Sequence, residues 1–170
     1  APLALLPLLW LAACTSSEER AATYAVAAEQ ALAAGDLVKA KLEAKNALQV
    51  APKNVPARMV MVEVTEQAGE IGQMLGHLEV VVNEDRTNVP ARVKLGNYLF
   101  AAQDYDGART FADEALAQSP DDPRARLLNA RLRLQGGDLE GGLADIERLL
   151  AEDPQNADAA MIRGMSFAFS

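Results

Sequence analysis

Apolar residues recur every three or four positions along most of the chain. Two stretches show this spacing clearly: Leu37-Ala40-Ala44-Ala47-Leu48 and Tyr105-Ala108-Ala112-Ala115-Leu116. Such spacing places apolar side chains on one face of an α-helix, and no segment alternates as a half-buried strand does. The pattern predicts nine helices, at about residues 18–34, 37–50, 55–68, 71–84, 89–102, 105–118, 123–135, 139–152 and 157–169.

Markers of helix ends repeat every 34 residues through the chain. One set is Gly35-Asp36, Gly69-Glu70, Gln103-Asp104 and Gly137-Asp138, and a second is Pro52, Arg86, Pro120 and Pro154. A third set, Ala57, Ala91, Ala125 and Ala159, has the same period. Proline ends a helix, and the Asn or Asp that follows it can cap the next one. One period shared by three sets indicates a stack of similar helical hairpins.

This pattern resembles the tetratricopeptide repeat. The third repeat carries it best, at Leu95-Gly96, Asp104-Tyr105, Ala108, Ala115-Leu116 and Pro120, whereas the second has Met74 and Arg86 at the small-residue and proline positions. The resemblance implies an all-α fold, a right-handed α-solenoid of about four hairpins plus the first helix of a fifth. The apolar face of that last helix, with Met161, Met165 and Phe169, leads us to expect more repeats or another domain after Ser170.

An apolar run precedes the repeats and ends in Leu11-Ala12-Ala13-Cys14. As a helix, thirteen residues span about 20 Å, short of a hydrocarbon core of about 30 Å, which favours a signal peptide over a membrane span. The tetrapeptide resembles the bacterial lipobox, which implies acylation of Cys14. Thr15 after the cysteine then suggests the outer membrane, with the chain facing the periplasm. The alternative is an ordinary signal peptide with an incidental cysteine.

Three segments follow from these patterns. Residues 1–13 are a signal peptide truncated at its start, residues 14–17 a lipidated N-terminus and tether, and residues 18–170 the repeat solenoid.

Composition narrows the function mainly by exclusion. The net charge of −8 disfavours nucleic acid as a partner, because nucleic-acid binding depends on cations that neutralise phosphates. Cys14 and His77 are the only cysteine and histidine, too few for a Cys/His metal site within one chain. His77 has no evident catalytic collaborator. We therefore expect no enzyme activity, no catalytic residue, no metal and no cofactor.

The family resemblance also implies a binding groove, lined by the first helix of each repeat. Its positions in this sequence are Glu29, Met59, Glu63, Glu66, Gln67, Val93, Asn97, Phe100, Leu127, Arg131 and Leu134. An acidic part leads into an apolar part, which suggests a basic or amphipathic protein segment as the ligand. The alternative is a merely solvated face. Asn97 matches a clamp for C-terminal carboxylates, but Val93 stands where that clamp has lysine, so clamp activity is not expected.

Arg58, Arg92 and Arg126 also repeat every 34 residues. They could form a stripe for an acidic polymer such as an exopolysaccharide. The alternative is pairing with acidic residues between repeats, with their stems packed between helices.

The segment from Lys45 to Arg58 resembles repeat lipoproteins of exopolysaccharide production and PEP-CTERM protein sorting. The chain is therefore expected to be a membrane-anchored scaffold that binds other envelope proteins. Two alternatives remain: a lipoprotein of outer-membrane assembly or a pilus or secretin pilot, and the adaptor region of a larger enzyme.

Overall fold

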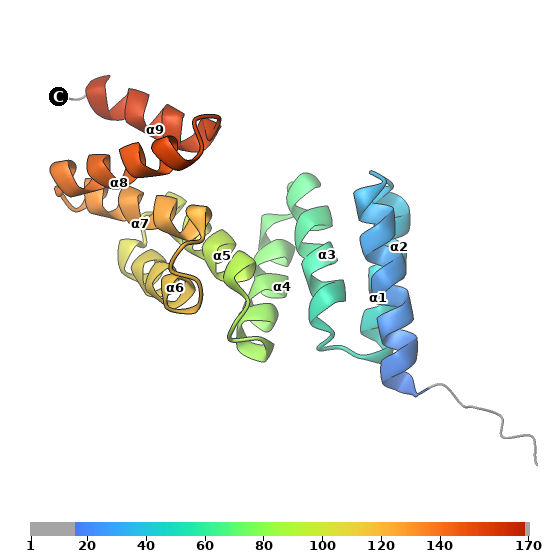
Figure 1. Ribbon diagram of the computed structural model, residues 1–170. Coiled ribbons are helices and arrows are strands. Elements are labelled where there is room, and N and C mark those ends of the chain that lie inside the picture. Colours follow the sequence, from blue (N-terminus) through green and yellow to red (C-terminus); the bar gives the residue numbers. More distant parts are fainter. Residues whose placement is uncertain (1–15, 169–170) are drawn as a thin grey trace, which may run out of the picture. The chain divides into compact units, whose positions relative to one another are not determined.

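The computed structural model describes residues 16–168, and in that range the only regular secondary structure is α-helix (Figure 1). The helices are α1 (Ser17–Ala33), α2 (Leu37–Val50), α3 (Val55–Gln67), α4 (Ile71–Glu84), α5 (Val89–Ala101), α6 (Tyr105–Gln118), α7 (Pro123–Gln135), α8 (Leu139–Glu152) and α9 (Ala157–Ala168). Every boundary lies within one residue of the range expected from the apolar spacing. The all-α fold is confirmed, while the expected leader and Cys14 lie outside the described residues.

The chain divides into two compact units, residues 1–64 and 65–170. In the first unit, α1 and α2 run side by side in opposite directions (Figure 1). Their shared interface consists mainly of alanine, with Ala28, Ala40 and Ala44 fully buried. Small side chains allow two helices to approach closely, so this hairpin is held by many short contacts without large side chains.

The second unit contains the hairpins α5–α6 and α7–α8, with α9 packed on α8. Its apolar clusters join successive hairpins. One unites Ala108 and Ala112 of α6 with Leu128 and Leu132 of α7. Another is formed by Ala130, Ile146, Leu149, Leu150 and Ala159, from α7, α8 and α9. Each hairpin thus buries its apolar side against the next one, as nearest-neighbour stacking requires.

Small residues mark the points where helices cross most closely. A Cβ atom added to Gly96 of α5 would lie 2.6 Å from Leu128 Cδ2 and 3.4 Å from the Ala108 carbonyl. One added to Gly142 of α8 would lie 3.1 Å from the Ala130 carbonyl. In the second repeat Met74 occupies the position that Gly142 has in the fourth. The Met74 side chain is fully buried. The larger methionine therefore fits at this position, where the sequence pattern left its packing open.

The turn inside each hairpin has one backbone geometry. Gly35, Gly69, Gln103 and Gly137 all have positive φ, at 77°, 72°, 65° and 89°. The residue after each donates its N–H to a carbonyl five positions back, as Asp138 does to Arg133 at 2.9 Å. This arrangement satisfies the last carbonyls of the first helix, and glycine adopts it without steric cost. Gln103 does carry that cost, because its Cβ crowds the backbone at positive φ.

The residue that closes this turn also caps the second helix. Asp36, Asp104 and Asp138 accept the N–H groups of Lys39, Gly107 and Gly141 at 2.9–3.0 Å. Glu70 occupies the same position before α4 and makes no side-chain cap hydrogen bond. Its longer side chain is disfavoured in this role.

The turns between repeats use caps as well. Asn54, Asn88, Asp122 and Asn156 accept the N–H groups of the repeating alanines Ala57, Ala91, Ala125 and Ala159. The 34-residue repetition seen in the sequence is therefore a repetition of helix caps.

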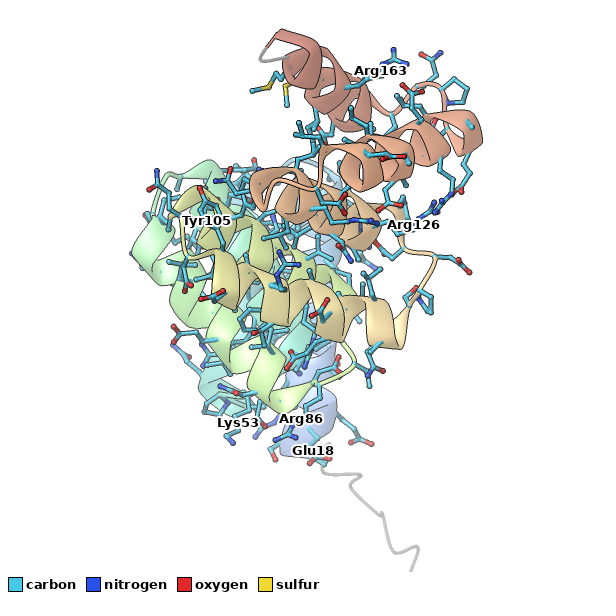
Figure 2. The ribbon with its side chains drawn as sticks, turned by 90° about the vertical axis from the view of Figure 1, so that its left-hand side faces the viewer. Glu18, Lys53, Arg86, Tyr105, Arg126 and Arg163 are labelled. Carbon is cyan, nitrogen blue, oxygen red and sulfur yellow. The ribbon has the colours of Figure 1, made fainter. Side chains whose placement is uncertain are left out.

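Two of the three repeating arginines, Arg92 and Arg126, stabilise the repeats from within, while Arg58 donates to the Pro52 carbonyl in the turn before α3. Arg92 is 5% exposed and donates to Glu114 Oε2 at 3.1 Å and to the Asp85 carbonyl. Arg126, labelled in Figure 2, holds Glu152 through two hydrogen bonds of 2.6 and 2.9 Å. Pairing with acidic residues is confirmed for both, but each partner lies on the second helix of the same repeat and not on a neighbouring one. Burial of Arg92 removes the middle member of the hypothetical polymer-binding stripe.

Replacing Gln103 with glycine should stabilise the second unit. Relief of about 1 kcal/mol of left-handed backbone strain outweighs the larger entropy of glycine in the unfolded chain, so a net gain of about 0.5 kcal/mol is expected. Urea denaturation followed by far-UV circular dichroism measures it. The matched control, Gly137→Gln, should lower the midpoint by a similar amount, and a lower midpoint for Gln103→Gly would contradict the assignment.

Replacing Glu70 with aspartate should supply the missing cap of α4. The shorter carboxylate can accept the N–H of Gln73, as Asp104 does for Gly107, but this N–H already donates to the Glu70 carbonyl at 3.0 Å, so a gain of at most about 1 kcal/mol is expected. Thermal denaturation gives the global effect, and hydrogen exchange at Gln73 reports the cap itself. The reciprocal change, Asp104→Glu, should lower stability. Equal exchange rates at Gln73 before and after the substitution would refute this explanation.

Candidate functional site

Polar and aromatic side chains of α5 and α7 lie in the second unit, where Arg131 contacts Asn97 and Phe100 and, separately, Lys94 and Tyr98 contact Glu66. We define the α5–α7 surface by Lys94, Asn97, Tyr98 and Phe100 of α5 and Arg131 of α7. Asn97, Phe100 and Arg131 were expected from the sequence to line a groove, and the structure brings these three together.

The Glu66 carboxylate at the end of α3 is bound at one edge of this surface. It accepts hydrogen bonds from Tyr98 Oη at 2.9 Å and from the Lys94 ammonium. Partial burial raises the pKa of Glu66, but these bonds and the charge of Lys94 outweigh burial, so the pKa lies below its usual value. Glu66 is thus ionised at neutral pH, and its charge is already balanced by α5.

The side chain of Arg131, on α7, contacts neutral side chains of α5. Its Nη1 donates to Asn97 Oδ1 at 2.6 Å, and its guanidinium carbon lies 4.2 Å from the centre of the Phe100 ring. Phe100 in turn meets Tyr105 edge to face, with ring centres 5.3 Å apart. A guanidinium above an aromatic face is attracted to the negative charge of the ring. The orientation of Arg131 is therefore fixed from two sides.

The charge of Arg131 has no carboxylate in direct contact among residues 16–168. Burial lowers the pKa of Arg131, and the charge of Asp158 on α9 opposes this from a distance beyond an ion pair. Arginine keeps its proton in proteins even so. The α5–α7 surface therefore holds a partly desolvated cation that only neutral side chains contact.

The remaining residues predicted for the groove lie in different environments. Val93 is 4% exposed and packs with Ala115 and Ala125, so its assignment to an exposed groove was wrong. Leu127 and Leu134 are partly buried against the cluster around Ile146, so they serve mainly in packing α7 on α8 and α9. The sequence pattern gives the face of a helix but not how closely the next helix covers it.

Besides Glu66, four predicted groove residues lie on α1 and α3. In the first unit, Glu29 is exposed on α1, and Met59 and Glu63 are partly buried on α3. Gln67, at the end of α3, is exposed. The acidic part of the predicted groove also includes Glu66, whose carboxylate is bound by residues of α5. A ligand would therefore meet less negative charge there than the sequence suggested.

Sequence reasoning did not identify Lys94, Tyr98 or Asp158 as members of this region. Lys94 and Tyr98 lie four positions apart on α5, and both are half-buried. Residues at that spacing share a helix face, so the pair could have been recognised as a polar patch. Their contact with Glu66, 28 and 32 positions away, leaves no local signal.

A hollow of about 320 Å³ elsewhere in the second unit is lined by Val82, Asn83, Arg86, Arg92, Phe111 and Glu114. Arg92 and Glu114 pair there with each other. Across residues 16–168, no three His, Cys, Asp or Glu side chains are grouped in a way suited to a metal ion. None of the helices in this range combines the length and apolar character needed to cross a bilayer.

Solved structures with the same fold include several repeat proteins. YrrB, described as a protein with an unusual peptide-binding site, aligns with a TM-score of 0.70 and 19% identity, over 88% of this chain and 77% of YrrB. PilW, a type IV pilus biogenesis factor, gives 0.68 and 19%, over 85% of this chain and 70% of PilW. An O-GlcNAc transferase from Thermobaculum terrenum gives 0.68 and 21%, over 81% of this chain but 27% of the enzyme. At these identities the likeness is one of fold alone.

No curated protein sequence shows a significant match to this chain. The sequence profile of the tetratricopeptide repeat, in contrast, matches residues 67–132 and again residues 99–165. Together these segments cover more than half of the chain. The chain therefore belongs to the tetratricopeptide repeat family, whose members generally act as scaffolds that bind peptides or proteins.

Proposed function

We propose that this protein is a lipid-anchored scaffold of the bacterial envelope that holds another protein on the α5–α7 surface. The observation that carries the proposal is the set of aromatic and cationic side chains fixed there by contacts between neighbouring repeats. A surface whose side chains are already ordered loses little conformational entropy on binding. Exopolysaccharide production or protein sorting and export is the process that we propose it serves.

The proposed lipid anchor lies directly before the first helix. Cys14 precedes α1 by only Thr15 and Ser16. Ser16 caps this helix, accepting the Glu19 N–H at 3.1 Å while its own N–H donates to Glu19 Oε2 at 2.7 Å. Two or more acyl chains at Cys14 would give stable attachment, at about 0.8 kcal/mol per buried methylene.

This tether would leave little slack between the bilayer and the first unit. Figure 2 shows Glu18 of α1 and Lys53, in the turn after α2, at the same end of that unit. With two residues of linker, we propose that this end faces the membrane, on the periplasmic side of the outer membrane.

Proteins with a similar fold suggest two other roles for this chain. PilW is a pilus biogenesis factor, which favours a role in pilus or secretin assembly as the second candidate. The O-GlcNAc transferase matches this chain over about a quarter of its own length, so the repeats could also be the adaptor of a larger enzyme. The identity of the bound partner separates the three.

Substitution of Cys14 by serine should abolish lipidation and release the protein from the membrane. The sequence has no other cysteine, so no second thioether can form. Palmitate labelling and mass spectrometry of the mature N-terminus measure the modification, and fractionation measures the release. A Thr15→Ser variant serves as the control and should remain attached. Membrane retention of Cys14→Ser with an unmodified N-terminus would argue against the anchor.

A photo-crosslinking residue placed at Ala101 should capture a partner in living cells. Ala101 is exposed one turn after Asn97 on α5, whereas the control position Asp113 is exposed on α6. Export or polysaccharide-synthesis proteins recovered from Ala101 alone would support the leading role, and pilus or barrel-assembly proteins the second. Identical products from both positions would show that binding does not occur on the α5–α7 surface.

A further inference from the structure

We propose that the exposed face of α2 lies on the surface of an anionic lipid bilayer. This face, the α2 stripe, consists of Val38, Leu42, Lys45 and Gln49, and all four residues are exposed. The proposal rests on the proposed function, because an anchor before α1 would hold the first unit at a membrane. It adds that the unit itself contacts lipid, with α2 lying along the surface.

The α2 stripe faces away from the helices on which α2 packs. Its members follow one another at steps of four, three and four residues, so they form one row along the helix. The buried side of α2 consists of Ala40, Ala44 and Ala47, which pack with residues of α1 and α3. Val38 has an exposed fraction of 83%, the largest among the exposed large apolar side chains of residues 16–168, and that of Leu42 is 56%. Apolar side chains this open to water gain free energy when another surface covers them.

Lysine is concentrated around this stripe. Four of the five lysines of the chain lie on α2 or in the turn after it, namely Lys39, Lys41, Lys45 and Lys53. Lys39 and Lys45 are exposed, and neither forms an ion pair with a residue in the range 16–168. Glu43, the carboxylate within α2, is half-buried and accepts a hydrogen bond from Asn46. The net charge along α2 is therefore positive, although that of the whole chain is −8.

The other repeats provide an internal comparison, because equivalent positions lie 34 residues apart. At the positions of Val38 and Lys45, the other second helices have exposed glycine or carboxylates: Gly72, Asp106 and Glu140 for the first, and Glu79, Asp113 and Glu147 for the second. Three helices of the same kind thus form without an apolar and cationic row. The α2 stripe is therefore not a requirement of the fold.

Apolar side chains beside lysines match the chemistry of an anionic bilayer surface. Valine and leucine can enter the boundary between headgroups and acyl chains, while the lysine ammonium groups stay at the depth of the phosphates. This attraction falls off within about 10 Å at 0.1 M salt, so the stripe must lie close to the bilayer. Cys14, the proposed site of acylation, precedes α1 by only two residues. This short tether favours a lipid surface over an acidic protein as the occupant.

The stripe also specifies how the first unit lies on the membrane. Lys53, in the turn after α2, is at the same end of the unit as Glu18, where the tether begins (Figure 2). From that end, α2 extends over 14 residues, or about 21 Å, toward Val38. Contact along the whole stripe would lay the unit on its side, with α2 parallel to the bilayer.

A fluorescent probe on the stripe reports this contact directly. The full chain with Cys14→Ser and Gln49→Cys carries an environment-sensitive dye at position 49 and is mixed with phosphatidylcholine vesicles, with or without phosphatidylglycerol. We expect a blue shift of the emission, and quenching by a bilayer-embedded quencher, with phosphatidylglycerol but not without it. The matched control places the dye through Ala117→Cys at the equivalent exposed position of α6, where it should remain in water. Because Cys14→Ser removes the acylation site, the result does not depend on the lipid anchor.

Three substitutions test the chemistry of the stripe by co-sedimentation with phosphatidylglycerol vesicles. Lys45→Asp gives α2 the residue that α6 has at this position and should lower affinity at least about fivefold. Leu42→Thr, also the residue of α6, should lower it about threefold. Arg148→Glu reverses a charge at an exposed position of α8 and should change it little. Circular dichroism should show unchanged folding, because α6 forms with the same residues.

The outcomes separate this proposal from the broader function. A dye at position 49 that stays in water on phosphatidylglycerol vesicles, or equal losses for Lys45→Asp and Arg148→Glu, would overturn the assignment of the α2 stripe to lipid. A photo-crosslinker at Gln49 that captures an acidic protein and no lipid would do the same. In each case acylation of Cys14 and partner capture at Ala101 would leave the anchored scaffold standing. Conversely, an unmodified Cys14 together with a shifted dye would remove the anchor and keep the α2 stripe.

Discussion

Close approach of paired helices at small residues is the constraint on which the rest of the structure depends. Ala40 and Ala44 bring α2 against α1, and Gly96 meets Ala108 where α5 and α6 cross. Because these contacts use almost no side-chain volume, the larger residues Leu128, Leu132 and Ile146 are left to fill the spaces between hairpins. Stability is thereby shared between a tight contact within each repeat and a bulkier contact with the next.

Small residues can meet within a repeat and large residues between repeats only if the helices begin and end at equivalent positions. The turns fix these positions. A single pair of residues, such as Gly137 and Asp138, closes one helix and caps the next. Departures occur where the backbone tolerates them: Gln103 adopts a conformation suited to glycine, and Glu70 leaves α4 without a side-chain cap. Neither changes the fold, since each affects one of many local terms of about 1 kcal/mol.

Sequence periodicity predicted the helices because caps, turns and apolar faces are local features. The groove implied by the family resemblance included Val93, which is buried, because a repeat position defines direction around a helix but not depth beneath a neighbour. It also counted Glu66 as available charge, although Lys94 and Tyr98 bind it from the next repeat. Contacts between side chains about one repeat apart depend on rotamers and burial, which spacing alone does not contain. Asn97, Phe100 and Arg131, which the groove prediction included, are joined by contacts through Arg131 and are partly exposed.

The net charge of the chain is negative, whereas the candidate site presents the positive charge of Arg131. The two are compatible because most of the negative charges lie at a distance from the site. The net charge is −8, yet several acidic side chains are committed to the fold, as Asp104 and Asp138 are to caps and Glu114 and Glu152 are to arginines. Exposed charges act weakly beyond about 8 Å at physiological ionic strength. At contact distance, desolvation sets the strength of a charge interaction. A bound ligand would therefore interact more strongly with the partly buried Arg131 than with distant carboxylates. Local burial is therefore a better guide to the partner of this surface than the sum of charges.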